Sequence, residues 1–194
     1  MKPITKILVA NRGEIALRVM RSAREMGIKT VAVYSEVDRR APHVLFADEA
    51  VCLGPAPSSD SYLKGDKIIA FAKELNVDAI HPGYGFLSEN AAFAAAVETA
   101  GITFIGPREH AIKVMGDKLS AKAAVEHFDV PLVPGSDGEV TDVEAAKKLA
   151  TDIGFPVMIK ASAGGGGKGM RIVHDVADFE NQMQRAVSEA TNSF

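Results

Sequence analysis

Short apolar runs alternate with amphipathic stretches through the first part of the chain. The continuous runs predict strands buried on both faces, at residues 6–10, 29–34, 51–53, 77–81 and 102–105. Between them, apolar residues recur every three or four positions and predict helices, at residues 14–26, 66–75 and 91–100. This alternation predicts an α/β fold with a parallel, doubly wound sheet. We expect residues 1 to about 107 to form one compact domain.

The pattern changes after residue 107. A longer helix is predicted for residues 109–128, and prolines and glycines break the chain at 131–138. Thr141 and Glu144 have the spacing of a capping box. The helix behind them has an inward stripe at Val143, Ala146, Leu149, Ala150 and Ile153. A final helix opening at Asp175 has its stripe at Phe179, Met183, Val187 and Ala190. We expect this second unit to be small and incomplete.

The composition is that of an ordinary globular protein, with 47% hydrophobic and 24% charged residues among 194. A net charge of −3 without a basic run argues against a nucleic-acid partner. The single cysteine, Cys52, excludes an internal disulfide and fits a reducing compartment. No apolar segment approaches membrane-spanning length, and residues 1–6 lead directly into a strand. We therefore expect a cytoplasmic protein that has no membrane partner.

A glycine-rich run at residues 163–169, Ala-Gly-Gly-Gly-Gly-Lys-Gly, separates strands predicted at 155–159 and 170–173. Its backbone N–H groups can close over an anion. Gly169 and a strand follow Lys168, so this is not the common phosphate loop, which needs Ser or Thr and then a helix. The alternative is a flexible turn that binds nothing. Lys160, at the end of the preceding strand, is a candidate phosphate ligand or a lysine extending into solvent. Lys118 alone is typical of a helix surface.

Two further segments, residues 11–14 and 81–90, follow the ends of predicted sheet strands. Ligands of open α/β sheets bind outside the carboxyl ends of the strands. The second segment is not a dinucleotide fingerprint, because Ser88 stands where the third glycine should be. The alternative for Ser88 or Asn90 is that it caps a helix. The alternative for His81 is that it is a packed histidine rather than a base. Glu14 with Arg18 has the spacing of a helical ion pair. No cluster has metal-ligand spacing, and no catalytic triad pattern occurs.

Taken together, residues 7–16, residues 81–90, Met-Gly-Asp-Lys at 115–118, and Lys-Ala-Ser with the glycine run at 160–169 closely resemble biotin carboxylase. The resemblance covers essentially the whole chain but under half of the family's polypeptide. It implies a Rossmann-like N-terminal domain at residues 1–114. It also implies that residues 115–194 are the opening part of an ATP-grasp domain with its lid.

The resemblance implies that ATP and bicarbonate form carboxyphosphate, whose carbon dioxide passes to a protein-linked biotin. It assigns the ATP phosphates to Lys118 and Lys160, and the lid to Gly164, Gly165, Gly166 and Gly167. Tyr84 would lie beside the biotin ureido ring, and Arg21 and Glu25 in a homodimer contact. The family's catalytic residues and Mg²⁺ ligands lie beyond Phe194. The resemblance therefore implies no catalytic or metal residue in this chain and no carboxylation by the chain alone.

The implied partners are ATP, bicarbonate, a biotin carboxyl carrier and a carboxyltransferase component. The final acceptor, whether acetyl-CoA, propionyl-CoA or pyruvate, is not readable from this chain. Three other interpretations stay open. Another ATP-grasp ligase, of the carbamoyl-phosphate or purine-pathway type, would share the glycine run and the lysines. A nicotinamide oxidoreductase would need a glycine fingerprint after the first strand, which residues 11–14 lack. The third is a non-catalytic module that self-associates.

Overall fold

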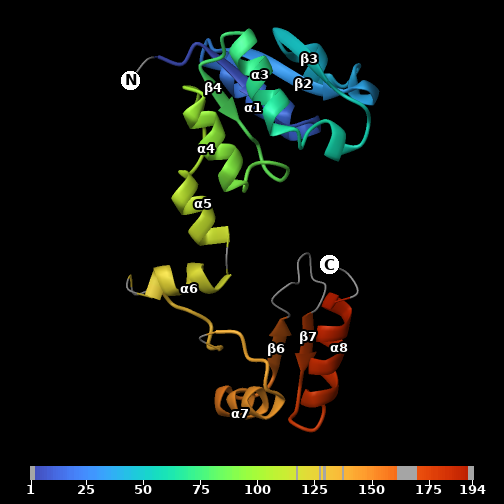
Figure 1. Ribbon diagram of the computed structural model, residues 1–194, viewed down its shortest axis with the longest axis vertical. Coiled ribbons are helices and arrows are strands. Elements are labelled where there is room, and N and C mark those ends of the chain that lie inside the picture. The colour runs from blue at the N-terminus through green and yellow to red at the C-terminus, as the bar shows by residue number, and fades with distance from the viewer. Residues whose placement is uncertain are drawn as a thin grey trace. The chain divides into compact units, whose positions relative to one another are not determined.

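A computed structural model describes residues 3–116, 118–126, 128, 130–136, 138–160 and 170–191. The chain folds as two compact units, residues 1–121 (unit 1) and 122–194 (unit 2). Figure 1 labels the elements of each unit along the chain. None of the helices among the described residues is long and apolar enough to span a membrane.

Unit 1 is built on a five-stranded sheet in which every pairing is parallel. Its strands are β1 (Lys6–Val9), β2 (Lys29–Ser35), β3 (Glu49–Gly54), β4 (Ala79–His81) and β5 (Thr103–Phe104), in the spatial order β3-β2-β1-β4-β5. The predicted α/β fold is confirmed. The chain runs outward from β1 to β3 on one side, then returns beside β1 and continues to β5 on the other.

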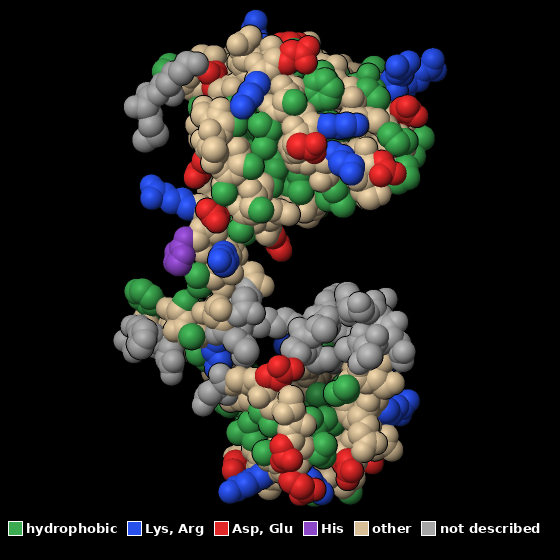
Figure 2. All heavy atoms as spheres, in the orientation of Figure 1, with side chains coloured by type: hydrophobic (Ala, Val, Ile, Leu, Met, Phe, Trp, Pro, Cys, Tyr) green, Lys and Arg blue, Asp and Glu red, His purple; other side chains and the backbone are tan. Residues whose placement is uncertain are grey.

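Alternate residues of each strand point to opposite faces of the sheet, so apolar side chains lie on both faces. Helices cover both of these faces. The helices of unit 1 are α1 (Gly13–Glu25), α2 (Pro42–Phe46), α3 (Gly65–Glu74), α4 (Ala91–Thr99) and α5 (Glu109–Gly116), with two short 3₁₀ turns, η1 (Glu36–Asp38) and η2 (Ser58–Asp60). Ile7 and Val9 pack with α1, whereas Leu8 packs with α3 and α4. On the face of unit 1 drawn in Figure 2, Lys and Arg side chains are interspersed with Asp and Glu.

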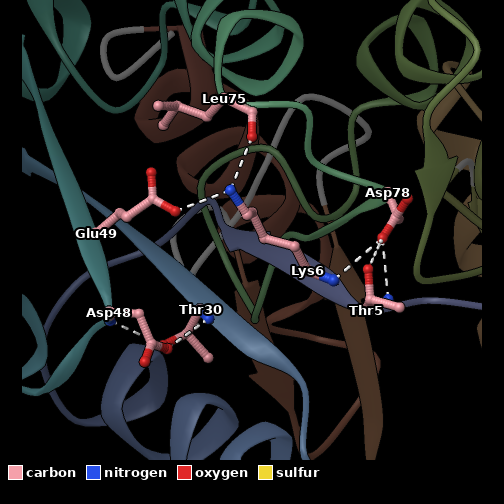
Figure 3. A network of polar contacts seen from close by, with 7 residues as sticks. All are labelled: Thr5, Lys6, Thr30, Asp48, Glu49, Leu75 and Asp78. Carbon is pink, nitrogen blue, oxygen red and sulfur yellow. Dashed lines mark hydrogen bonds and ion pairs between the residues drawn. The ribbon is translucent and has the colours of Figure 1, made fainter.

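Polar side chains tie the amino ends of the strands together (Figure 3). Lys6 Nζ, on β1, donates to Glu49 Oε1 on β3 (2.8 Å) and to the carbonyl of Leu75 after α3 (2.9 Å). Asp78 Oδ2 accepts hydrogen bonds from the backbone N and the hydroxyl of Thr5 (2.9 and 2.8 Å). These bonds satisfy groups at strand ends that lack ladder partners.

Helix α6 (Lys118–Glu126) crosses the boundary between the units. The helix predicted for residues 109–128 is thus described as two segments, α5 and α6, on either side of residue 117, which lies outside the described residues.

Unit 2 contains an antiparallel hairpin covered by two helices, α7 (Val143–Ile153) and α8 (Phe179–Thr191). The hairpin strands are β6 (Val157–Lys160) and β7 (Met170–Val173), with Val157 opposite Val173 and Lys160 opposite Met170. Phe179 and Met183 of α8 pack on this hairpin beside Ala150 of α7.

Four details of unit 2 differ from the sequence predictions. Helix α8 begins at Phe179, not at the predicted Asp175. The N-cap of α7 is Asp142, not Thr141, because the Asp142 carboxylate accepts a bond from Ala145 N (2.7 Å). Ile153, predicted inward, is exposed where α7 ends. On α8, Ala186 is buried and Val187 is exposed, so the stripe advances by three residues after Met183 rather than four.

We expect acid pH to weaken the fold partly through Asp48, the residue directly before β3. Its Oδ2 accepts bonds from Thr30 N (2.8 Å) and Thr30 Oγ1 (2.9 Å). The backbone bond from Thr30 lowers the pKa of Asp48 below its ordinary value of 3.8, against the opposing effect of burial. A carboxyl group whose pKa is lower in the folded state than in the unfolded state stabilises the folded state at pH values above its unfolded pKa. This contribution is lost as the pH falls through the folded pKa.

Asp48→Asn should therefore lower the free energy of unfolding at pH 7 and change it less at about pH 3. Urea unfolding at both pH values measures this, with Asp60→Asn, an exposed carboxylate, as the matched control. Equal losses for Asp48→Asn at the two pH values would contradict the prediction.

Candidate functional site

The carboxyl ends of β1 and β4 form the point where the connections of the sheet diverge. The loop after β1 leads into α1 on one face, and the loop after β4 leads toward α4 on the other. Such a switch point leaves a crevice outside the strand ends. A cavity of about 320 Å³ lies there, lined by residues 11–15 of the first loop and helix and by residues 84–86 of the second. We call it the switch-point cavity.

Asn11 joins the two loops. Its side-chain Nδ2 donates to the carbonyls of Pro82 and Tyr84, both at 2.8 Å. Its Oδ1 accepts from Arg12 N at 2.9 Å. Asn11 is only 3% exposed, and these bonds use both amide hydrogens and the amide oxygen. The backbone ladder below continues with Ala10 N donating to His81 O (2.8 Å).

The loop after β4 can lie this close to Asn11 because of its glycines. Gly83 (φ +68°) would place an added Cβ 2.8 Å from Asn11 Nδ2. Gly85 (φ +64°) has no described atom within 4 Å of such a Cβ. Both conformations are in the left-handed region that favours glycine.

Tyr84 stands at the mouth of the switch-point cavity with 61% of its surface exposed. Its hydroxyl donates to Glu14 Oε1 on the first turn of α1 (2.6 Å), and this bond to a carboxylate raises the pKa of Tyr84.

The spacing of Glu14 and Arg18 predicts an ion pair along α1, and this pair is not formed. Arg18 Nη1 instead donates a hydrogen bond to Ser22 Oγ.

A cluster of charged and aromatic groups supports the cavity. The Tyr62 and Phe86 rings stack with centroids 5.3 Å apart, and the Arg12 guanidinium lies 5.5 and 5.9 Å from them. Arg12 Nη1 is 3.5 Å from Asp38 Oδ2, which also accepts from the Tyr62 hydroxyl at 2.6 Å. Sequence reasoning missed this cluster, because its members come from four segments that share no local pattern.

The same bonds shift two pKa values. Burial, together with the bond to Asp38, raises the pKa of Tyr62 to about 12. Burial alone would raise the pKa of Asp38, but bonds from Tyr62, Ser35 and Arg12 outweigh it and lower the pKa. At neutral pH the cluster therefore holds a carboxylate and a protonated phenol.

His81 and Asn90 both make hydrogen bonds within the loop after β4. His81 Nδ1 accepts from Gly83 N (3.0 Å), and burial lowers the pKa of His81, so the neutral ring makes this bond. Asn90 caps α4, accepting from Phe93 N at 2.8 Å. The alternative of a helix cap at Asn90 is confirmed.

The hairpin of unit 2 has one packed face and one open face. Val157, Ile159 and Val173 point toward α7 and α8. Alternation along each strand directs Met158, Lys160, Met170 and Ile172 to the opposite side. Met158 and Ile172 lie opposite each other and are 47% and 57% exposed. This open face, apolar with an exposed lysine at one end, can receive a flat apolar group that carries an anionic tail.

Arg171 extends the packed face of the hairpin at the glycine-run end. Its Nη2 is 2.7 Å from Glu189 Oε2 on α8, and its Nη1 donates to the Met170 carbonyl at 2.9 Å. A second cavity, of about 370 Å³, lies between Arg171 and α8.

Of the residues predicted to form the site, the structure describes the side chains of Tyr84, in the switch-point cavity, and Lys160, on the open face. Lys118 begins α6, but its side chain lies outside the described part of the chain. Gly164, Gly165, Gly166 and Gly167 also lie outside it. Across the side chains that are described, no group of three or more His, Cys, Asp or Glu residues could hold a metal ion.

Two family models match the chain. Residues 3–112 match the biotin carboxylase N-terminal domain, and residues 117–194 match the ATP-binding domain of the carbamoyl-phosphate synthase L chain. Biotin carboxylase of Allochromatium vinosum is 56% identical over 98% of the chain. The human mitochondrial propionyl-CoA carboxylase alpha chain is 53% identical over 100% of it. The chain spans 43% of the first relative and 26% of the second.

Solved structures of biotin carboxylases are similar to this chain in fold and in sequence. Campylobacter jejuni biotin carboxylase in complex with β-γ-ATP has a TM-score of 0.90 and 50% identity, covering 99% of the chain and 43% of the solved one. The biotin carboxylase domain dimer of Hydrogenobacter thermophilus 2-oxoglutarate carboxylase has a TM-score of 0.88 and 49% identity. It covers 100% of this chain and 43% of its own, and was solved with MgADP, ADP and bicarbonate.

Alanine substitutions at Gly83 and Gly85 isolate the contact with Asn11. Either alanine costs about 1–2 kcal/mol for its left-handed backbone. Only the Gly83 Cβ would meet Asn11, and relieving that overlap costs about 1–3 kcal/mol more. We expect both variants to have a lower free energy of unfolding in urea. The loss should be larger for Gly83→Ala than for Gly85→Ala, by about 1–3 kcal/mol. Equal losses would show that the loop does not depend on this close approach.

Proposed function

Because this chain belongs to the biotin carboxylase family, we propose that it is the amino-terminal part of an enzyme that carboxylates protein-linked biotin using ATP and bicarbonate. In this proposal, residues 1–114 are the N-terminal domain and residues 115–194 the opening part of the ATP-grasp domain. The match of both parts of the chain, in order, to biotin carboxylases and their domains carries the proposal.

ATP would be held by the unit 2 hairpin. The apolar side chains of Met158 and Ile172 suit the base, and Lys160 at the strand end suits the phosphates. Lys118 and the backbone N–H groups of residues 164–167 would complete the phosphate contacts. Phosphoryl transfer depends on holding negative oxygens in line and neutralising them, which lysines and backbone donors do best in a closed, dry site.

Mg²⁺, when bound with ATP, would neutralise phosphate charge, and it prefers carboxylate ligands. The described residues offer no carboxylate cluster of that kind. In this proposal the family resemblance, rather than the absence of such a cluster among the described residues, places the metal ligands and the catalytic groups in the part of the enzyme that the chain does not span. The chain alone is then expected to be inactive.

Biotin would enter the switch-point cavity. Tyr84, exposed at its mouth and fixed by Glu14, supplies a ring against which the ureido group can lie. The proposed partners are a biotin carboxyl carrier, a carboxyltransferase component and a second copy of the enzyme. Arg21 and Glu25 are exposed on α1, where a homodimer contact can form.

The relatives limit what is proposed beyond this reaction. They include bacterial biotin carboxylases and mitochondrial propionyl-CoA and methylcrotonoyl-CoA carboxylase subunits. The acceptor is therefore left unassigned, and a cytoplasmic location stays a prediction. The match of residues 117–194 to a carbamoyl-phosphate synthase domain supports the second candidate, another ATP-grasp ligase. The match of residues 3–112 favours biotin.

The complete carboxylase, meaning this chain continued to the length of its relatives, should form ADP in a reaction that needs bicarbonate and is stimulated by biotin. The 194-residue chain should show no such activity and should bind ATP weakly. A coupled ADP assay measures both. Stimulation by ammonia but not biotin would favour the second candidate, and sustained biotin-dependent turnover by the chain alone would contradict the assignment of catalytic groups.

Lys160 should contribute directly to ATP binding. Lys160→Met in the complete carboxylase removes a charge-assisted contact worth about 1.5–3 kcal/mol, so we expect ATP affinity to fall roughly tenfold or more. Titration with an ATP analogue measures this. Lys148→Met, on the exposed side of α7, is the matched control and should bind normally. Equal affinities for the two variants would remove Lys160 from the site.

A further inference from the structure

We propose that Asn11 is a positioning residue for biotin, fixing the main chain at Tyr84 so that the tyrosine ring borders the switch-point cavity. The inference rests on the proposed function for the identity of the ligand. The placement of Tyr84 by Asn11 rests on the hydrogen bonds alone.

The geometry requires an asparagine. Both hydrogens of Nδ2 are used, one on the Pro82 carbonyl and one on the Tyr84 carbonyl, and Oδ1 accepts from Arg12 N. Aspartate has nearly the same shape but offers no donor, so its carboxylate would face two carbonyl oxygens in a buried site.

These bonds position a loop rather than hold the sheet. They connect residues 71 and 73 positions apart, and they lie beyond the end of the β1–β4 ladder. The segment that carries Asn11 also carries Glu14, which accepts from the Tyr84 hydroxyl. Tyr84 is thus held twice, at its carbonyl by Asn11 and at its phenol by Glu14. Its ring is left exposed beside the cavity.

The first test is Asn11→Asp in the complete carboxylase, with free biotin as the probe. Displacement of a positioned group by about 1 Å can cost 100-fold in rate, so we expect the KM for biotin to rise roughly 10- to 100-fold. Any change in the KM for ATP should be at least about tenfold smaller. If Asn11→Asp does not fold, Asn11→Ala, which removes the same bonds without adding a charge, is measured with the same expectation.

Asn90→Ala is the matched control, because Asn90 is an exposed asparagine at the other end of the same loop, and its loss removes a hydrogen bond that caps α4 rather than one that holds Tyr84. It should destabilise the fold by about 1 kcal/mol and leave the KM for biotin within about twofold of wild type. Equal KM values for biotin in the Asn11 and Asn90 variants would overturn the inference while leaving the proposed function intact.

A second readout does not depend on turnover. In ¹³C-tyrosine NMR of the wild-type chain, the Tyr84 signal should titrate at a higher pH than the signal of an ordinary tyrosine. In the Asn11 variant, the pH of this titration should fall toward the ordinary value. An unchanged titration would overturn the placement of Tyr84 by Asn11. A wild-type carboxylase that shows no biotin dependence would instead overturn the proposed function, and with it biotin as the ligand.

Discussion

One buried amide bridges the place where the chain diverges around its sheet. The connections after β1 and β4 leave toward opposite faces, and two parallel strands alone would not fix the loops beyond them. Asn11 closes this gap with bonds to Pro82, Tyr84 and Arg12. The close approach of Gly83, the position of Tyr84 and the shape of the switch-point cavity all depend on these bonds.

The side chains at the two ends of the sheet differ in where their hydrogen bonds lie. At the amino ends, Lys6 bonds with Glu49 and with the carbonyl after α3, so its charge is used within the fold. At the carboxyl ends, Tyr84 and Glu14 bond to each other at the surface and border open space. The hairpin of unit 2 repeats the division, with one face packed on helices and the other carrying exposed apolar residues and Lys160.

Much of this architecture could be predicted from the sequence, because strands buried on both faces and amphipathic helices leave strong local patterns. The strands at 6–10 and 29–34 and the helix cap at Asn90 are examples. Two finer predictions were wrong. Asp142 rather than Thr141 caps α7, and Ala186 rather than Val187 faces the core. In both cases two adjacent residues were suitable, and tertiary packing decided between them.

The site itself was only partly predictable. The glycines around Tyr84 predict a ligand loop, which stays a prediction, but nothing local pairs Glu14 with Tyr84, 70 residues away. The Arg12, Asp38, Tyr62 and Phe86 cluster is likewise assembled by the sheet topology. Asn11 was part of a recognisable motif, yet its role became visible only when both loops were placed.

Hydrogen exchange of the Asn11 side-chain amide, followed by ¹⁵N NMR, tests the central bridge most directly. Buried, hydrogen-bonded protons exchange only when the structure opens. Both Asn11 amide protons should exchange at least roughly tenfold more slowly than those of the exposed Asn181. Exchange of the Asn11 protons at the Asn181 rate would mean that Asn11 does not join the two loops and does not hold the switch-point cavity in shape.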